Sequence, residues 1–352
     1  MPTRLIRRAD GEDSMRDLRG ASVVITGASS GIGRAAAMAF AKRGACVTLA
    51  ARRKAVLREA AAACEGEGGR ALPVPTDVGD PEAVRQLARR AIDAFGKIDV
   101  WINNAGVGAA GAFVETPIEA HDQVVRTNLL GYLHGAHAVL PHFIERGAGV
   151  LINNLSFGAW VPAPFAAAYS ASKFGLRGFT DALRAELAFA PGIHICDVYP
   201  SFIDTPGVQH GANYTGRVLK PAPPVYAPRR VAEAMVALAL RPRRSVTVGS
   251  VATLARLGYF IAPRLMRVGS AALMKTYLAQ ASHSPVTDGN LFRPIAEGRA
   301  IEGGWRSPTE RAMVTAGLAI AAGLATLLLA PRAARGAGGK NFAMRAPSAA
   351  GR

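Results

Sequence analysis

The sequence predicts an α/β protein with a doubly wound parallel sheet and a helical C-terminal extension. Three observations lead to this fold class. Half of the 352 residues are hydrophobic, short β-branched segments alternate with Ala-rich helical ones from Ala21 to Gly249, and helical periodicity follows Gly249. A chain of this length and composition can bury a full core. Repeated alternation of strands and helices is typical of a parallel sheet with helices on both faces.

Seven segments have the composition of buried strands, and we expect them to form one sheet. In chain order they read SVVIT, CVTLA, ALPVP, DVWIN, GVLINN, IHICDVYP and SVTVG. Helices are expected between them over Gly31 to Arg43, up to about Cys64, and over Pro81 to Phe95, Asp122 to Glu145, and Tyr169 to Phe189. Together these elements predict one doubly wound domain of residues 20–250.

The flanking segments differ in composition from this domain. Residues 1–19 turn acidic where a secretory signal would have its apolar core, so we expect a flexible arm there. Residues 251–305 mix apolar and basic side chains and predict a helical extension. Ala312 to Ala330 carry no charge over nineteen residues, enough for a spanning helix, so we expect a membrane helix over residues 306–331. Residues 332–352 are rich in Gly, Ala and Arg and predict a disordered basic tail.

Cysteine and histidine usage indicates neither a disulfide framework nor a metal site. The three cysteines, Cys46, Cys64 and Cys196, are far apart, which favours a reducing, cytosolic setting. His134 and His137 have helical spacing but no third ligand nearby. We therefore expect no bound metal.

A glycine-rich turn, TGASSGIGR, follows the first predicted strand and opens the next helix. Missing side chains let the backbone approach a pyrophosphate, and the free N–H groups of the helix N-terminus can bind it. A plain tight turn would also use glycine, but the strand before it and the helix after it favour a dinucleotide site on a Rossmann sheet. The residues expected to contact the cofactor here are Gly27, Ser29, Ser30, Gly31, Ile32 and Gly33.

The end of the second strand indicates which dinucleotide binds. An acidic residue there would hold the ribose 2′-OH of NAD, whereas arginine accommodates the extra phosphate of NADP. This chain has Arg52 and Arg53, with Arg34 nearby in sequence, and no carboxylate between the glycine turn and Lys54. NADP(H) is therefore predicted, with a solvated run of charge as the alternative.

Ser156, Tyr169 and Lys173 form a candidate catalytic set. Tyr169 and Lys173 are four residues apart on a predicted helix, so they share a face and the ammonium would favour the phenolate. A tyrosine whose pKa is lowered can exchange a proton with a carbonyl or alcohol, and the Ser156 hydroxyl can bond the same substrate oxygen. Tyr and Lys at this spacing occur on many helices, but their position after a dinucleotide fold favours catalysis.

These motifs in this order resemble the short-chain dehydrogenase/reductase family. The resemblance covers roughly residues 18–250 and depends on TGASSGIG, on NNAG from Asn103 to Gly106, and on YSASK from Tyr169 to Lys173. It implies that Tyr169 donates or accepts the proton, and that Lys173 bonds the nicotinamide ribose and lowers the tyrosine pKa. Ser156 would orient the substrate oxygen, and Asn128 would support a water-linked proton relay.

The resemblance also implies further cofactor contacts. Asp77 and Val78 would lie at the adenine, and Thr205 would bond the nicotinamide carboxamide. Where the family usually has Pro-Gly after the sixth strand, this chain has Pro200 and Ser201, and serine narrows the backbone freedom of that turn. The residues implied to line the cofactor cleft at the fourth strand are Asn104, Ala105 and Gly106.

The expected activity is hydride transfer between NADP(H) and a lipophilic alcohol or ketone. The side chains expected around the substrate are apolar or aromatic, and no arginine is placed to clamp a carboxylate. The alternative is a membrane-attached NADP(H)-binding scaffold or sensor without turnover. The resemblance further implies a homodimer or homotetramer. The expected pocket residues are Val107, Phe157, Trp160, Phe165 and Phe202.

The net charge of +17 is concentrated toward the C-terminus, where residues 234–287 hold seven basic side chains and no acidic one. We find no nucleic-acid-binding motif, so an anionic lipid surface is the favoured partner and no nucleic acid is expected. Spanning by Ala312 to Ala330 would carry the basic tail across the membrane, against the positive-inside tendency. A helix lying in the interface, or one that packs in a dimer, remains an alternative for a cytoplasmic domain.

Overall fold

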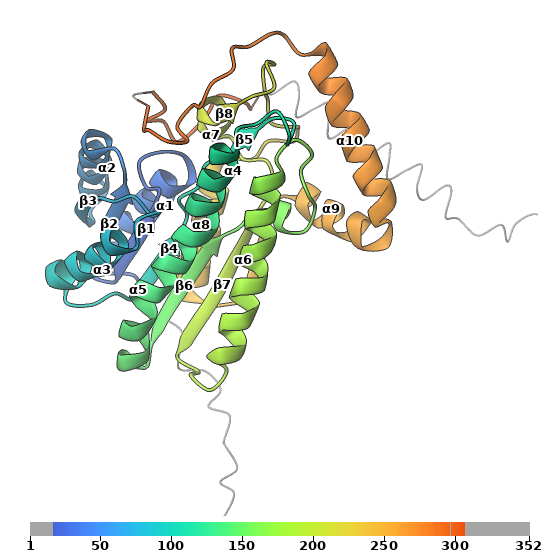
Figure 1. Ribbon diagram of the computed structural model, residues 1–352. Helices are drawn as coiled ribbons and strands as arrows, with labels where there is room; N and C mark the ends of the chain where they lie inside the picture. Colours follow the sequence, from blue (N-terminus) through green and yellow to red (C-terminus); the bar gives the residue numbers. More distant parts are fainter. Residues whose placement is uncertain (1–16, 296, 307–352) are drawn as a thin grey trace, which may run out of the picture. The chain divides into compact units, whose positions relative to one another are not determined.

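The computed structural model describes residues 17–295 and 297–306, which form a seven-stranded parallel sheet flanked by helices (Figure 1). The strand order is β3-β2-β1-β4-β6-β7-β9. Strands are added to one side of β1 up to β3 and to its other side from β4 onward, as in a doubly wound fold. The seven strands coincide with the seven predicted segments. They are β1 Ser22–Thr26, β2 Cys46–Ala51, β3 Arg70–Pro75, β4 Val100–Asn103, β6 Gly149–Asn154, β7 Ile193–Pro200 and β9 Ser245–Val248.

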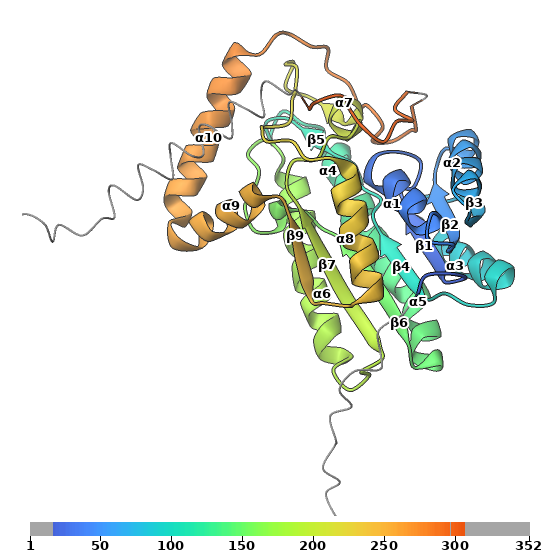
Figure 2. The same ribbon diagram turned by 180° about the vertical axis from the view of Figure 1, so that it is seen from behind.

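Helices cover both faces of this sheet (Figures 1 and 2). One face carries α1 Gly31–Ala41, α2 Lys54–Gly66 and α8 Pro228–Leu240. The other carries α3 Pro81–Phe95, α5 Gly131–Arg146 and α6 Ala167–Glu186. The remaining elements are β5 Ala109–Ala110, α4 Ile118–Val125, the π-helical turn η1 Arg126–Leu130, the 3-10 turn η2 Phe157–Ala159, α7 Gly207–His210, β8 Ala212–Asn213, α9 Ser250–Ile261 and α10 Pro263–Gln280.

The strands alternate their side chains between two buried apolar layers. In β1, Val23 and Ile25 pack under α1 and α8, whereas Val24 packs under α3 and α5. All three are fully buried. Strands buried on both faces read as continuous apolar runs, which is why they could be recognised from sequence alone.

Local signals account well for α3, whose bounds agree with the prediction. Asp80 caps its N-terminus by accepting hydrogen bonds from the N–H groups of Glu82 and Ala83, and Pro81 occupies the first turn. Gly96 ends the helix in the left-handed conformation at φ 78°. These short-range interactions do not need the rest of the fold.

Other elements differ from the prediction. The helix expected over Asp122 to Glu145 begins at Ile118 and passes through the π-helical turn η1 before it continues as α5. Helix α8, which packs against α1, is not among the elements that the sequence pattern predicts. The extension contains α9 and α10, followed by an irregular segment of residues 288–295 and 297–306, here called the strap. A loop is also what the sequence predicts from Ser282 to Trp305.

The predicted membrane helix from residue 307 onward, the tail over 332–352 and residues 1–16 of the arm lie outside the described residues. Within the described ranges, no helix combines the length and the apolar character needed to cross a bilayer.

Candidate active site

The carboxyl ends of β1, β2, β4, β6 and β7 meet at one edge of the sheet, where the loops carry most of the predicted site residues (Figure 1). A cleft opens along this edge, at the position where doubly wound sheets bind ligands. Predicted residues that line it are Gly27, Ser29, Ser30, Gly31, Ile32, Gly33, Arg52, Arg53, Asp77, Val78, Asn104, Ala105, Gly106 and Thr205.

The glycine turn adopts a conformation that side chains would prevent. Gly27 and Gly31 have φ of 68° and 54°, which favours glycine. A Cβ atom at Gly33 would lie 2.3 Å from the carbonyl oxygen of Gly27, well inside contact distance. The turn can therefore pack against the start of α1 only with glycine at this position.

Asn104 joins the ends of three strands. Its backbone N–H donates to Thr26 Oγ1 (2.9 Å), and its side-chain amide donates to the Thr26 carbonyl (2.9 Å). Its Oδ1 accepts from the Asn154 amide (2.9 Å). These bonds hold the β1 turn, the β4 turn and the end of β6 in one arrangement, so the cleft is preformed by backbone and amide contacts.

Asn128 lies in the π-helical turn η1 and is fully buried. Its amide donates to the Val107 carbonyl (2.8 Å), and its Oδ1 accepts from the Val107 N–H (2.8 Å). The side chain thereby fixes the loop after β4. Both its hydrogen-bonding atoms serve the loop, so its side chain acts as a positioning group here.

Ser156, which follows β6, lies beside Tyr169 and Lys173 of α6. The Ser156 hydroxyl accepts from the Gly158 N–H (3.0 Å) and also hydrogen-bonds the Tyr169 phenol. Lys173 Nζ donates to the Asn154 carbonyl (3.2 Å) and lies 5.8 Å from the centre of the Tyr169 ring. The lysine thus lies over the ring of Tyr169.

The pKa of Tyr169 differs from the expectation. Burial raises the pKa of Tyr169, and the Ser156 hydrogen bond opposes this only in part. Burial also lowers the pKa of Lys173 to about 7. The structure therefore does not show the lowered Tyr169 pKa that was expected, because desolvation of the phenol outweighs its hydrogen bond with Ser156.

The structure places Arg52 and Arg53 at the cleft, but in contacts that the sequence did not indicate. Arg52 donates to the carbonyl oxygens of Asn290, Leu291 and Phe292. Arg53 donates to main-chain carbonyl oxygens farther along the strap, at Ile295 (3.3 Å), Glu297 (2.6 Å) and Gly298 (2.9 Å), and to Ser29 Oγ (3.2 Å).

The strap continues across the glycine turn. Arg34 donates to the Arg299 carbonyl (2.7 Å), and the Gly31 N–H donates to the Ala300 carbonyl (3.0 Å). Asn290, Pro294, Ile295 and Glu297 of the strap line the cleft. The strap is therefore one wall of this site.

Asp204 anchors the end of the strap. Its side chain is 1% exposed and accepts from the N–H groups of Gly303 and Trp305 (both 2.9 Å) and from Arg306 Nε (2.9 Å). Burial opposes ionisation of this carboxyl, but the Trp305 N–H and the Arg306 guanidinium outweigh it and lower the pKa of Asp204. Asp204 lies in the loop after β7, next to Thr205.

Sequence reasoning missed several residues of the cleft wall. Thr76, Thr127, Asn154 and His210 line the cleft together with the strap residues. Thr76 follows β3, Asn154 ends β6, Thr127 lies in η1 and His210 ends α7. Only their spatial position brings these side chains to the cleft. Of the predicted cofactor contacts, Tyr169, Lys173 and Pro200 do not line this part of the cleft. Pro200 is buried at the end of β7, and Ser201 donates its N–H to the Val248 carbonyl (2.9 Å).

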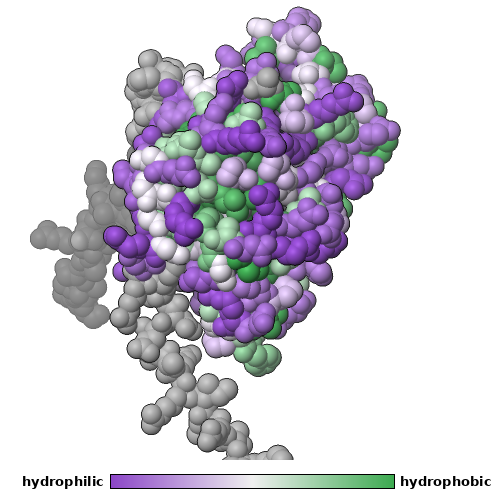
Figure 3. Space-filling view, turned by 90° about the vertical axis from the view of Figure 1, so that its left-hand side faces the viewer, coloured by the Kyte–Doolittle hydropathy of each residue, from purple (hydrophilic) through white to green (hydrophobic). Residues whose placement is uncertain are grey.

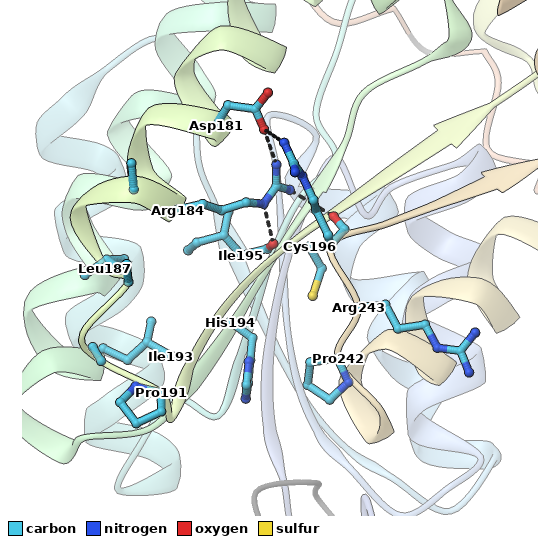
Figure 4. Close-up of a pocket in the computed structure, with 14 residues that line it drawn as sticks. Asp181, Arg184, Leu187, Pro191, Ile193, His194, Ile195, Cys196, Pro242 and Arg243 are labelled. Carbon is cyan, nitrogen blue, oxygen red and sulfur yellow. Dashed lines mark hydrogen bonds and ion pairs between the residues drawn. The ribbon is translucent and has the colours of Figure 1, made fainter. Parts of the chain in front are cut away.

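A second hollow lies at the opposite end of β7 (Figure 4). There Arg184 pairs with Asp181 and with buried Asp197, both at 2.8 Å, and Arg244 also pairs with Asp181 at 2.9 Å. These charges satisfy one another, so the network stabilises the fold. Among the described residues, no group of His, Cys, Asp or Glu side chains could hold a metal ion, and the three cysteines are buried and unpaired.

Comparison with known proteins decides the family. The family model described as short chain dehydrogenase matches residues 21–213, more than half of the chain. The chain belongs to the short-chain dehydrogenase/reductase family. It is accordingly an oxidoreductase with the α/β fold of that family.

Individual relatives agree with this assignment. The uncharacterized oxidoreductase YxnA of Bacillus subtilis is 35% identical over 277 residues, which cover 77% of this chain and 76% of that protein. The probable oxidoreductase EphD of Mycobacterium tuberculosis is 41% identical over 184 residues, covering 52% of this chain. The match spans only 31% of EphD.

A solved family structure also matches. The alcohol dehydrogenase of the archaeon Thermococcus sibiricus, complexed with 5-hydroxy-NADP, superposes with a TM-score of 0.57 at 26% identity. The match covers 66% of this chain and 97% of that one.

Proposed function

We propose that this protein is an NADP(H)-dependent oxidoreductase that transfers a hydride between the nicotinamide and a lipophilic alcohol or ketone. The observation that carries the proposal is the cluster of Ser156, Tyr169 and buried Lys173 beside the cleft, to which Lys173 is joined by its hydrogen bond to the carbonyl of Asn154 in the cleft wall. Tyr169 and Ser156 would act on one substrate oxygen, and Lys173 would support Tyr169.

The choice of NADP(H) is supported by charge at the end of β2. Arg52 and Arg53 line the cleft, and Asp77 is the one predicted cleft residue with a carboxylate. A guanidinium binds phosphate through paired N–H donors. The archaeal relative was solved with an NADP analogue. Arg52 and Arg53 would hold the 2′-phosphate, and the glycine turn would hold the pyrophosphate.

The nicotinamide supplies or accepts the hydride when the cofactor is bound. Tyr169 handles the proton at its phenol oxygen. Because burial raises the pKa of Tyr169, the phenol stays protonated at neutral pH, which suits donation to a carbonyl oxygen. Lys173, whose pKa falls to about 7, can hold or release a proton near neutrality beside it.

A lipophilic substrate is supported by the side chains next to Ser156. Phe157 and Phe202 contact each other edge to face with ring centres 5.1 Å apart. Trp160 lies close by against Tyr199 (5.6 Å). Aromatic walls of this kind favour apolar ligands.

The experiment is a comparison of wild type with Tyr169→Phe on a panel of lipophilic ketones, followed by NADPH absorbance. We expect turnover to fall by about 10²- to 10⁴-fold, the usual contribution of a general acid, while NADPH binding is retained. Turnover at the wild-type rate in Tyr169→Phe would refute the assignment of the acid.

Tyr277→Phe is the matched control, because it removes another phenol hydroxyl that bonds only the Val218 carbonyl (2.9 Å). It should keep full turnover. Tight NADPH binding by the wild type without oxidation on any ketone or alcohol would instead support a binding protein without turnover.

A further inference from the structure

The helices α9 and α10 form a hairpin, here called the C-terminal hairpin (residues 250–280), with few buried side chains. Ala252 is the only residue of α9 that is buried, and α10 has none. The hairpin lies beyond β9, to one side of the sheet (Figures 1 and 2). A helix normally gains its stability by burying an apolar face, so the outward face needs an explanation.

Large apolar side chains gather around the turn of the hairpin and point outward. Five of them are 54% to 86% exposed, with Phe260 the most exposed at 86%. Isolated exposed apolar residues are ordinary, but a contiguous group marks a surface that meets a partner. The five are Leu257, Phe260, Ile261, Leu265 and Val268.

A basic stripe runs beside this apolar patch on α10. Arg264, Arg267 and Lys275 recur at helical spacing, next to the stripe of Leu265 and Val268. Neighbouring basic and apolar stripes are typical of helices that lie in a membrane interface. Residues 234–287 contain seven basic side chains and no acidic one.

The hairpin is held to the domain on its inner side. Within the hairpin, Met266 of α10 packs over Gly258 of α9, with its sulfur 3.3 Å from where a Cβ atom would stand. Other side chains join the hairpin to the rest of the domain. Tyr277 donates to the Val218 carbonyl (2.9 Å). Arg256 lies 3.8 Å above the ring of Trp160, which follows the turn after Ser156. These contacts leave the apolar patch exposed, and in the basic stripe Arg267 donates within the hairpin, to the Tyr259 hydroxyl of α9 (3.4 Å).

Charge decides which partner fits. In a two-fold dimer of this surface, each patch would face its own copy, so arginines would approach arginines without an acidic residue to compensate. Within the described part of the chain, Arg244 is the only one of the seven basic residues that forms an ion pair. An anionic lipid surface offers both the negative charge and the apolar layer.

We propose that the outer face of the C-terminal hairpin docks on an anionic lipid surface, with Phe260 and its apolar neighbours in the interface and the α10 basic stripe on the headgroups. Figure 3 shows the side of the molecule that carries α2 and α3, where hydrophilic side chains predominate around a small apolar area. The proposal is independent of the catalytic activity.

The test uses the full chain with Phe260→Trp and vesicles of phosphatidylglycerol or phosphatidylcholine that contain brominated lipid. Phe189→Trp is the matched control, because Phe189 is 97% exposed at the far end of α6. Bromine quenches only nearby indoles, and the chain already contains Trp101, Trp160 and Trp305. The readout is therefore the quenching of each variant beyond that of the wild type, which isolates the indole added at position 260 or 189. We expect quenching of Trp at position 260 on phosphatidylglycerol, none at position 189, and reversal by high salt.

A second measurement removes the charge. The double variant Arg264→Gln/Arg267→Gln should partition onto phosphatidylglycerol vesicles roughly 25-fold more weakly than the wild type. The control is the double variant Arg58→Gln/Arg90→Gln, which removes two exposed charges from α2 and α3 and should change partitioning little. Equal binding of the two double variants, or no quenching at position 260, would overturn the proposal. Concentration-dependent dimerisation that the Phe260→Trp change alters, without vesicle binding, would assign the face to a second copy instead.

Discussion

The anchor of the strap at Asp204 can be tested by changing one atom of its carboxylate. In Asp204→Asn the shape and one acceptor oxygen are retained, but the charge is lost. The new amide would place N–H donors opposite Arg306 Nε, which now donates to the carboxylate at 2.9 Å. We expect the strap to detach more often, because its end loses a charged partner.

The size of the effect follows from the contacts. Asp204 accepts three hydrogen bonds at 2.9 Å and is 1% exposed. Hydrogen bonds to a charged group contribute about 1.5–3 kcal/mol each, and removing one partner of a buried pair costs about 3–5 kcal/mol. Because Arg306 is 22% exposed and can be rehydrated, we expect about 2–4 kcal/mol. This is a shift of roughly 30- to 10³-fold in strap opening.

Two assays report on this opening. Trypsin should cut the variant after exposed Arg299 much faster than the wild type, since cleavage needs an unfolded strap. Fluorescence titration should show weaker NADPH binding, because Asn290, Pro294 and Ile295 would leave the cleft wall. An unchanged cleavage rate together with an unchanged NADPH affinity would refute the view that Asp204 holds the strap on the cleft.

Glu302→Gln provides the matched control, because it removes a charge from the strap at an exposed pair. Glu302 bonds Arg306 at 2.5 Å but is 45% exposed. Exposed pairs contribute about 0–1 kcal/mol, so protease sensitivity and NADPH affinity should stay near the wild-type values.

Three further predictions concern the cofactor turn and the buried lysine. Gly33→Ala should lower the free energy of unfolding in urea by about 1–3 kcal/mol, since its Cβ atom would lie 2.3 Å from the Gly27 carbonyl oxygen. Gly178→Ala is the control: a Cβ atom there meets open space, so this change should be neutral or stabilising. Replacing both Arg52 and Arg53 by Ala should lower the NADPH-to-NADH affinity ratio by about 10-fold or more, and an unchanged ratio would remove these residues from 2′-phosphate binding. The pKa of Lys173 is about 7 in the folded chain and about 10.4 unfolded. Between these pH values the unfolded chain binds one more proton than the folded chain. The free energy of unfolding of the wild type, measured relative to that of Lys173→Met, should therefore rise with pH by up to about 1.4 kcal/mol per pH unit. A difference that does not change with pH would contradict a neutral buried amine.

The sheet and the glycine turn were predictable because their causes are local. The inner strands β1, β4 and β6 are apolar runs buried on both faces, and α3 carries its own cap at Asp80 and stop at Gly96. The turn from Gly27 to Gly33 needs glycine for backbone reasons that no other part of the chain changes. The spacing of Tyr169 and Lys173 likewise places them on one helix face wherever that helix lies.

The strap was not predictable, because it binds mainly through its main-chain carbonyl oxygens. Arg52 and Arg53 donate to backbone atoms of residues 290–298, and every residue type offers such an acceptor. No side-chain pattern marks the segment, so its position over the cleft depends on the folded sheet. The π-helical turn at Asn128 depends in the same way on the loop at Val107.

The sequence by itself determined the parallel sheet, the dinucleotide turn and the identity of the residues that meet beside it. Only the tertiary structure decided their electrostatic state and what covers them. The direction of the Tyr169 pKa is the clearest case, since a lysine four residues away predicts a lowered value but burial raises it. Desolvation depends on all the atoms packed around a group, and spacing along the chain does not contain that information.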